Sequence, residues 1–147
     1  MEIAILALGC FWGPEIKFSK LKGVLKTEVG YCGGINKDTT YKEVCTGNTN
    51  HAEVVKLYFD EKIITYEKIL KIFFQIHDPT TLNSQGPDFG TQYRSEIFYL
   101  NDKQKVVAEK ILKDIDKNLS GEVVTKISLL KNYCPAEEYH QKYLEKR

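Results

Sequence analysis

The chain has 147 residues, of which 42% are hydrophobic and 28% charged, and its formal net charge is +1. These values are ordinary for a soluble globular protein. Lys and Glu are interspersed along the sequence, so the pattern favours neither nucleic-acid binding nor attachment to a membrane surface.

We expect one domain spanning residues 1–147, because this length is sufficient to bury one sizeable core. The apolar run at the start is too short for a signal peptide or a membrane span, and no basic region precedes it. A monomer in the cytoplasm is therefore the expected form.

Four cysteines are present, Cys10, Cys32, Cys45 and Cys134. No two of them have C-x-x-C spacing, and the three histidines do not complete a zinc pattern. The sequence therefore predicts no metal and no other cofactor. In a cytoplasmic chain such cysteines indicate free thiols and redox chemistry rather than a disulfide framework.

An apolar run over 3–8 predicts a buried strand. Pro14 is tolerated only in the first turn of a helix, so the next helix covers about 12–20. Cys10 then lies where the strand meets the helix N-terminus, and the dipole and free N–H groups there lower the pKa of a thiol. From this stretch alone, a nucleophile and a buried structural cysteine are equally compatible with the pattern.

The middle of the chain alternates between strands and helices. Residues 24–31 and 52–59 are predicted strands, and the second alternates in polarity as a half-buried strand does. The polar, turn-rich segment 35–50 between them predicts a loop. Thr65 caps a helix that continues to about residue 76.

The second half begins with a segment of low periodicity, 78–93, and loops of this length inside compact domains are often functional. A short strand is predicted over 96–100. A capping pattern at Asn101 and Gln104 opens a helix to about residue 118. A strand over 123–129 follows, and Pro135 predicts the start of a last helix.

The predicted order is β-α-β-β-α-β followed by helix, strand and helix. The first six elements match the split βαβ, ferredoxin-like arrangement. We therefore predict an α+β fold, a two-layer sandwich in which helices pack on a mixed sheet.

Several polar side chains could carry chemistry, although each also has an ordinary structural interpretation. Glu53 fits an edge-strand carboxylate in water, and Asp88 fits a turn residue. Tyr41 and Tyr93 fit packed phenols with their hydroxyl groups at the surface. His140 fits a hydrogen-bonded histidine on the last helix.

Taken together, these residues fall in segments that resemble the A-type peptide methionine sulfoxide reductases. The similar segments follow the family's order along nearly the whole chain: Gly-Cys-Phe-Trp-Gly-Pro-Glu at 9–15, Gly-Tyr-Cys-Gly-Gly at 30–34, Tyr-Lys-Glu-Val-Cys-Thr-Gly at 41–47, His-Ala-Glu at 51–53, His-Asp-Pro at 77–79, Gln-Gly-Pro-Asp-Phe-Gly-Thr-Gln-Tyr-Arg-Ser at 85–95 and Ala-Glu-Glu-Tyr-His-Gln at 136–141.

The resemblance implies reduction of the S epimer of methionine sulfoxide, free or in proteins, to methionine. It implies that Cys10 is the nucleophile and that Glu53 protonates the sulfoxide oxygen. Tyr41 and Tyr93 match phenols that donate hydrogen bonds to that oxygen, and Asp88 matches a carboxylate that orders the site.

The resemblance also implies that Phe11 and Trp12 form an apolar pocket for the ε-methyl group of the substrate. The chemistry agrees with these roles. A sulfoxide oxygen is a poor leaving group, so attack on sulfur needs proton delivery to oxygen, which a partly neutral carboxyl can supply. Two fixed phenols stabilise the charge that develops on this oxygen, and the thiol is left as sulfenic acid.

Recycling of the sulfenic acid is where the sequence departs from the family. Many relatives carry resolving cysteines in a glycine-rich tail, and this sequence has no such tail. Cys134 is our first candidate for a resolving thiol, because the segment after it lies near the active site in the family. Cys32 is the second, Cys45 is expected to be structural, and direct reduction by an external thiol is the third route. The resemblance implies thioredoxin or glutaredoxin as the reductant.

Two other functions are compatible with a reactive cysteine. One is a hydrolase in which Cys10 works with His51 or His140. The other is a thiol-based redox sensor, in which Cys10 oxidises and changes partner binding without turnover.

Overall fold

The computed structural model describes residues 1–146. Its elements follow in the order β1 (Glu2–Leu8), α1 (Trp12–Ser19), β2 (Val24–Cys32), α2 (Tyr41–Cys45), β3 (Ala52–Phe59), α3 (Tyr66–Gln75), β4 (Ser84–Gln85), β5 (Asp88–Phe89), η1 (Thr91–Tyr93), β6 (Ser95–Tyr99), α4 (Asp102–Asn118), β7 (Lys126–Leu129), β8 (Cys134–Pro135) and η2 (Glu138–His140), where η marks a turn of 3₁₀ helix.

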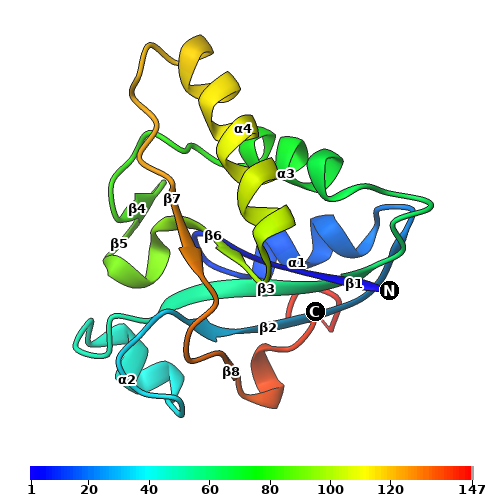
Figure 1. Ribbon diagram of the computed structural model, residues 1–147. Helices are drawn as coiled ribbons and strands as arrows, with labels where there is room; N and C mark the ends of the chain where they lie inside the picture. The colour runs from blue at the N-terminus through cyan, green and yellow to red at the C-terminus, as the bar shows by residue number, and fades with distance from the viewer. Residues whose placement is uncertain (147) are drawn as a thin grey trace.

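The main sheet has the strand order β7-β6-β1-β3-β2-β8. Its four central strands pair antiparallel in the order β6-β1-β3-β2, which is the ferredoxin-like order. Strand β7 adds parallel to β6 at one edge, and β8 adds antiparallel to β2 at the other. The predicted α+β fold with a mixed sheet is therefore confirmed (Figure 1).

The larger hydrophobic core lies between one face of the sheet and three helices. Phe18 of α1, Leu70 of α3 and Ile111 of α4 are buried there against sheet residues such as Leu6 and Leu57. Helix α3 forms as predicted, since Thr65 Oγ1 accepts the Lys68 N–H at 3.1 Å. Helices α1, α3 and α4 thus form the second layer over one face of the sheet.

The opposite face of the sheet carries a smaller apolar cluster that includes Ala7, Cys32 and Phe98. No helix belongs to this cluster in the described part of the chain. Instead, the segment that links β7 to β8 crosses this face from one edge of the sheet to the other (Figure 1). Its Leu130 and Tyr133 pack on the cluster.

Three predictions about local structure are wrong. The segment 35–50 contains a short helix, α2, and the segment 78–93 contains the β4–β5 hairpin and η1. Strand β7 covers only Lys126–Leu129, shorter than the strand predicted over 123–129.

The predicted last helix is also absent from the described residues, because Pro135 lies in β8 opposite Gly30 and a single 3₁₀ turn follows. Tertiary hydrogen bonds explain this outcome. The Gln141 side chain accepts the Val29 N–H and donates to the Val29 carbonyl, both at 2.9 Å. Lys142 adopts a positive φ of 51°, which no regular helix permits.

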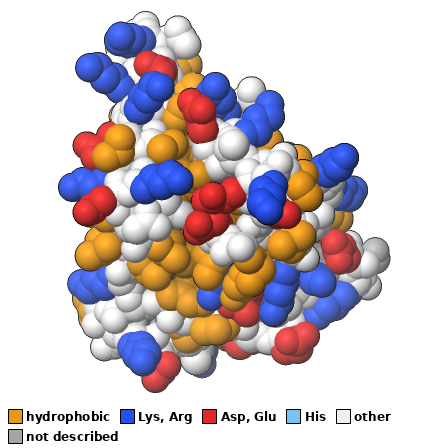
Figure 2. Space-filling model, turned by 45° about the vertical axis from the view of Figure 1, so that its right-hand side comes forward, with side chains coloured by type: hydrophobic (Ala, Val, Ile, Leu, Met, Phe, Trp, Pro, Cys, Tyr) orange, Lys and Arg blue, Asp and Glu red, His pale blue; other side chains and the backbone are white. Residues whose placement is uncertain are grey.

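The surface shows no separation of charge into regions of one sign on the face drawn in Figure 2, where basic and acidic side chains are interspersed with apolar ones. No helix in residues 1–146 has the length and apolar character needed to cross a bilayer.

Candidate active site

Cys10 lies in the turn between β1 and α1, as predicted, and its side chain is half-buried. The preceding Gly9 has a φ of 98°, and a Cβ there would come within 2.9 Å of the Gln85 side chain. A side chain at this position would therefore be strained and would push away the β4–β5 hairpin. Glycine lets the hairpin, which carries Asp88, close against the turn that carries Cys10.

The expected low pKa of the Cys10 thiol is wrong. Burial raises the pKa of Cys10 to about 11, and the charges of Glu53 and Asp88 raise it as well, while the N–H of Trp12 opposes them. Removing a thiolate from water costs more here than the helix N-terminus recovers. Cys10 therefore holds its proton at neutral pH.

Glu53 lies on β3, which is a central strand and not the half-exposed one expected from its alternating pattern. Its side chain is 1% exposed. Oε1 accepts the N–H of Phe11 at 3.3 Å, and Oε2 has no hydrogen-bond partner among the described residues. Burial, with the charge of Asp88 adding to it, raises the pKa of Glu53 to about 8. The carboxyl is thus largely protonated at pH 7, with one oxygen free to meet a ligand.

The phenols of Tyr41 and Tyr93 come from two separate elements, the first residue of α2 and the last of η1. Burial raises the pKa of both, to about 12 for Tyr93, and the charge of Glu53 contributes to each shift. Asp88 acts in the same direction on Tyr93. The structure therefore brings these four side chains, which are far apart in the sequence, within electrostatic reach of one another.

The two aromatic side chains after Cys10 differ in exposure. Phe11 is 1% exposed, with its ring 5.8 Å from that of Tyr31 and 5.3 Å from that of His140. Trp12 is partly exposed and stacks on Tyr143 with a centroid distance of 3.8 Å. Together they give the Cys10 turn an apolar wall.

The segment after β8 closes around this wall, and the sequence did not predict its contacts. The Glu137 carboxylate accepts the hydroxyl of Tyr31 at 2.8 Å and the N–H of Tyr41 at 2.9 Å. It therefore fixes the start of α2, where the Tyr41 phenol originates. The only sequence signal for this role was the Ala-Glu-Glu-Tyr-His-Gln motif at 136–141.

The buried histidine of this segment is His140, whose Nδ1 accepts the indole N–H of Trp12 at 3.1 Å. Its Nε2 has no partner among the described residues, and burial lowers the pKa of the ring. His140 thus bonds to the aromatic wall, and His51 Nε2 faces the Asn36 carbonyl at 2.8 Å. Neither ring is hydrogen-bonded to Cys10 within the described part of the chain.

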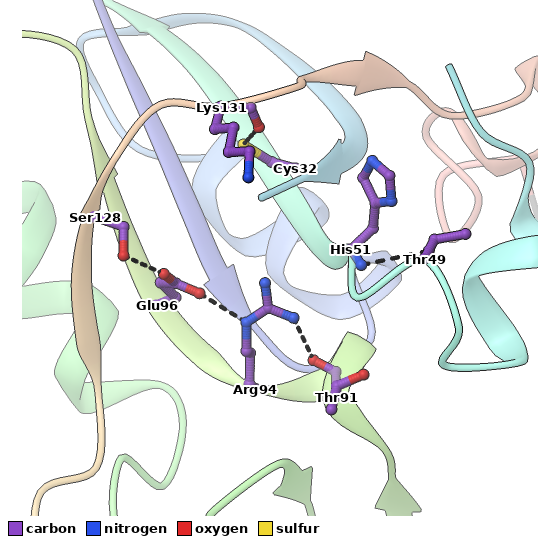
Figure 3. Close-up of polar contacts among 8 residues, drawn as sticks. All are labelled: Cys32, Thr49, His51, Thr91, Arg94, Glu96, Ser128 and Lys131. Atoms are coloured by element: carbon purple, nitrogen blue, oxygen red, sulfur yellow. Dashed lines mark hydrogen bonds and ion pairs between the residues drawn. The ribbon is translucent and has the colours of Figure 1, made fainter. Parts of the chain in front are cut away.

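The four thiols are all free, and they lie on different sides of the sheet. Cys32 belongs to the apolar cluster of the face without helices, where its Sγ contacts the Lys131 carbonyl at 3.2 Å (Figure 3). Burial raises the pKa of Cys32 to about 11. The sheet therefore separates Cys32 from the Glu53 side.

Cys134 lies on the Glu53 side. On β2, Tyr31 is paired with Cys134 of strand β8 on one side and with Glu53 of strand β3 on the other. Directly opposed residues of antiparallel strands point to the same face, and two strand spacings make about 10 Å. Cys134 is half-buried, with its Sγ 3.7 Å from the Thr39 carbonyl.

Cys45, the exposed last residue of α2, lies one helical turn from Tyr41. A hydrogen bond with the Tyr41 phenol lowers the pKa of Cys45, whereas burial raises it more strongly. Within residues 1–146 no group of three His, Cys, Asp or Glu side chains is arranged to hold a metal ion.

Comparison with known proteins places this geometry in a family. A family model described as peptide methionine sulfoxide reductase matches residues 2–147. The chain is 80% identical to the peptide methionine sulfoxide reductase MsrA of Pelagibacter ubique (strain HTCC1062), over 100% of both chains.

Solved structures of relatives have the same fold. Reduced Mxr1 from Saccharomyces cerevisiae matches with a TM-score of 0.95 and 42% identity, over 99% of this chain and 85% of that one. Mxr1 in complex with Trx2 matches with a TM-score of 0.69 and 26% identity, over 97% and 84% of the two chains.

Proposed function

Because the chain belongs to the peptide methionine sulfoxide reductase family and has that enzyme activity, we propose that it reduces the S epimer of methionine sulfoxide, free or in proteins, through Cys10. The Cys10 sulfur attacks the sulfoxide sulfur while the oxygen is protonated. Methionine leaves, and Cys10 takes the oxygen as sulfenic acid. One thiol and one sulfoxide thus become one sulfenic acid and one thioether, with no net change in protons.

The observation that carries this mechanism is the buried Glu53 carboxyl, which lies beside the Cys10 turn and accepts the Phe11 N–H. A carboxyl with a pKa of about 8 and an unpartnered Oε2 can donate its proton to the sulfoxide oxygen. The thiol of Cys10, whose pKa is about 11, must lose its own proton in the same step. That proton reprotonates the Glu53 carboxylate, so the step takes up no net proton from solvent.

The phenols of Tyr41 and Tyr93 supply the remaining contacts to the oxygen. The pKa of each is raised, so both hydroxyl groups keep their protons at neutral pH and can donate hydrogen bonds to the sulfoxide oxygen. Fixed donors aimed at an oxygen that gains charge lower the barrier most when water is excluded. Asp88 lies close enough for its charge to raise the pKa of both Glu53 and Tyr93, which helps to keep these two proton donors protonated.

Selection of the epimer comes from the apolar wall. A sulfoxide sulfur has three different neighbours, so fixing the oxygen and the methyl group leaves only one direction for the rest of the substrate. Phe11 and Trp12 hold the methyl group, and the phenols with Glu53 hold the oxygen. The R epimer would place either its methyl group among the donors or its oxygen against the aromatic rings.

For recycling, we assign the resolving role to Cys134, since it shares the sheet face of Glu53 and Cys32 does not. Its thiol attacks the Cys10 sulfenic acid, a disulfide forms and water leaves. A thioredoxin- or glutaredoxin-type dithiol then reduces the disulfide, in keeping with the Trx2 complex of the yeast relative. Free thiols fit a reducing compartment, the cytoplasm, where the enzyme acts as a monomer.

The test is intact mass spectrometry of the pre-reduced protein after incubation with the S sulfoxide and no reductant, with methionine release measured in parallel. We expect one methionine per protein from the S epimer, none from the R epimer, and none with Cys10→Ser. Peroxide oxidation of Cys10 without methionine release from sulfoxide would instead identify a redox sensor.

A further inference from the structure

The orientation of Tyr93 depends on a very short element. Its 3₁₀ turn, η1, follows Gly90, and the two backbone bonds at its end are Tyr93 N–H to the Gly90 carbonyl at 3.0 Å and Arg94 N–H to the Thr91 carbonyl at 3.3 Å. A turn of three residues has little stability of its own. A precise phenol position therefore requires contacts from outside the turn.

The Arg94 side chain supplies such a contact. Its Nη1 donates to the Thr91 carbonyl at 2.9 Å, so this oxygen accepts both the backbone N–H and the guanidinium of the same residue (Figure 3). Thr91 and Arg94 are therefore joined by two hydrogen bonds, one from the Arg94 backbone and one from its side chain. The guanidinium group closes the turn in which Tyr93 is the last residue.

The guanidinium is itself fixed to the sheet. Arg94 Nε donates to Glu96 Oε1 at 2.7 Å, and Ser128 Oγ donates to Glu96 Oε2 at 2.5 Å (Figure 3). Glu96 lies on β6 opposite Ala7 of β1 and Lys126 of β7. The chain of contacts therefore runs from a strand outside the ferredoxin-like core, β7, through Glu96 and Arg94 to the turn.

The surroundings leave the guanidinium little freedom. The side chains of Arg94 and Glu96 are only 12% and 6% exposed. A Cβ at Gly33 would come within 3.0 Å of Arg94 Nη2 and 2.8 Å of the Phe98 ring, so the glycine at the end of β2 makes the space the guanidinium fills. A planar fork with several donors suits this site, whereas an ammonium group can make only one of these contacts well.

We propose that Arg94, held by Glu96 and Ser128, is a positioning residue that aims the Tyr93 phenol at the sulfoxide oxygen. The inference rests on the proposed role of Tyr93. The two residues are consecutive, but their side chains lie on opposite sides of the sheet. The Tyr93 phenol lies near Glu53 and Asp88, whereas the Arg94 guanidinium binds Glu96, which in turn binds Ser128. Arg94 acts on the reaction only through the residue before it.

The experiment is a double-mutant cycle in single turnover at saturating S sulfoxide, with methionine formation as the readout. Tyr93→Phe removes one donor, and we expect it to slow the reaction by at least about tenfold. Arg94→Lys keeps the charge and loses the fork, and we expect a loss of about tenfold from a misplaced phenol. In the Tyr93→Phe background, Arg94→Lys should cost less than about twofold, because the group it positions is gone.

Glu96→Gln provides a second test of the same contact and should behave as Arg94→Lys does, including the loss of its effect in the Tyr93→Phe background. The matched control is Gln104→Leu. Gln104 is also buried and makes two side-chain hydrogen bonds at the far end of β6, to Leu100 N and the Ile3 carbonyl. The Gln104→Leu variant should have a lower thermal unfolding temperature than wild type and an unchanged rate of single turnover.

The outcomes separate this inference from the proposed function. The positioning role would be overturned if Tyr93→Phe slowed methionine formation and Arg94→Lys did not. It would also be overturned if the two rate losses multiplied in the double variant. Either result would leave the proposed mechanism intact. A Tyr93→Phe variant with the wild-type rate would overturn the role of the phenol and the inference with it. A rate loss in Gln104→Leu equal to that in Arg94→Lys would show that the effect is general destabilisation.

Discussion

The indole N–H of Trp12 donates a hydrogen bond to Nδ1 of His140, 3.1 Å away, across 128 residues of sequence. The imidazole is neutral at pH 7, since burial lowers its pKa. With Nδ1 as acceptor, the proton of the neutral ring must lie on Nε2. His140 thus fixes the Trp12 side of the proposed methyl pocket without needing to contact the substrate itself.

His140→Leu should therefore weaken substrate binding more than it slows the chemical step. Losing one buried hydrogen bond costs about 1 kcal/mol, which corresponds to about a fivefold rise in KM. His140→Asn offers an oxygen near the position of Nδ1 and should recover most of the affinity. Because Trp12 is the only tryptophan, its fluorescence should shift in the Leu variant and return in the Asn variant. Equal KM values for all three proteins would contradict the role.

Glu53 should make the folded protein less stable as pH rises. Its folded-state pKa, about 8, is above the ordinary value of 4.5. Between these values the folded state binds more protons than the unfolded state, so the stability that the neutral carboxyl gives is lost as pH rises toward and through 8. Glu53→Gln cannot ionise and should unfold at a higher temperature than wild type at pH 8, with a smaller difference at pH 5.

The same carboxyl predicts a pH dependence of the reaction. Single-turnover methionine formation should fall as pH rises through about 8, because the proton donor is lost. Glu53→Gln should be slow at every pH from 6 to 9 and show no such fall. A wild-type rate that stays constant to pH 9 would contradict the acid role of Glu53.

His77 should weaken the fold at acid pH. Its Nδ1 contacts the Phe73 carbonyl at 2.5 Å and its Nε2 contacts Ser95 Oγ at 2.8 Å, and burial lowers its pKa to about 4. The unfolded state takes up a proton near pH 6.5, so stability is lost as pH falls from 6.5 toward 4. At pH 4.5 the loss is about 2 kcal/mol relative to pH 7. Urea unfolding at both pH values should show the free energy of unfolding changing by about 2 kcal/mol less favourably in wild type than in His77→Gln between pH 7 and 4.5, because the other titrating groups, Glu53 included, are common to both proteins.

The assignment of the resolving cysteine is tested by the mass of the oxidised product. With Cys134 intact, the protein should become two hydrogens lighter after one turnover, through a Cys10–Cys134 disulfide. Cys134→Ser should still form methionine and become one oxygen heavier, as a sulfenic acid. Cys32→Ala, the matched control, should behave as wild type, because its thiol lies behind the sheet. A disulfide that forms in Cys134→Ser and disappears in Cys32→Ala would reverse the assignment.

The sequence was sufficient for the elements whose pattern is local. The apolar run of β1, Thr65 at the start of α3 and Asn101 at the start of α4 all lie where expected, because capping and periodicity act over a few residues. The ferredoxin-like strand order also followed from the order of elements.

The errors came from contacts between distant segments. Glu53 looked like an edge carboxylate, and only the pairing of β3 on both sides shows that it is buried. The pKa of Cys10 was expected to be low because the helix terminus is local, whereas burial in the folded chain raises it, as do the charges of Glu53 on β3 and Asp88 on β5. Pro135 suggested a helix, and the bonds made by Glu137 and Gln141 hold the chain in another path.

The paired bonds between Gln141 and Val29 have a consequence for solubility. Strand β8 covers only Gly30 and Tyr31 of β2, so the next backbone groups along that edge would be open to a strand from another molecule. The Gln141 amide accepts the Val29 N–H and donates to the Val29 carbonyl, which also accepts the Ala136 N–H at 3.0 Å. Gln141 and Ala136 thus occupy the backbone groups of Val29 that a strand from another molecule would pair with, and they block edge-to-edge association at this position.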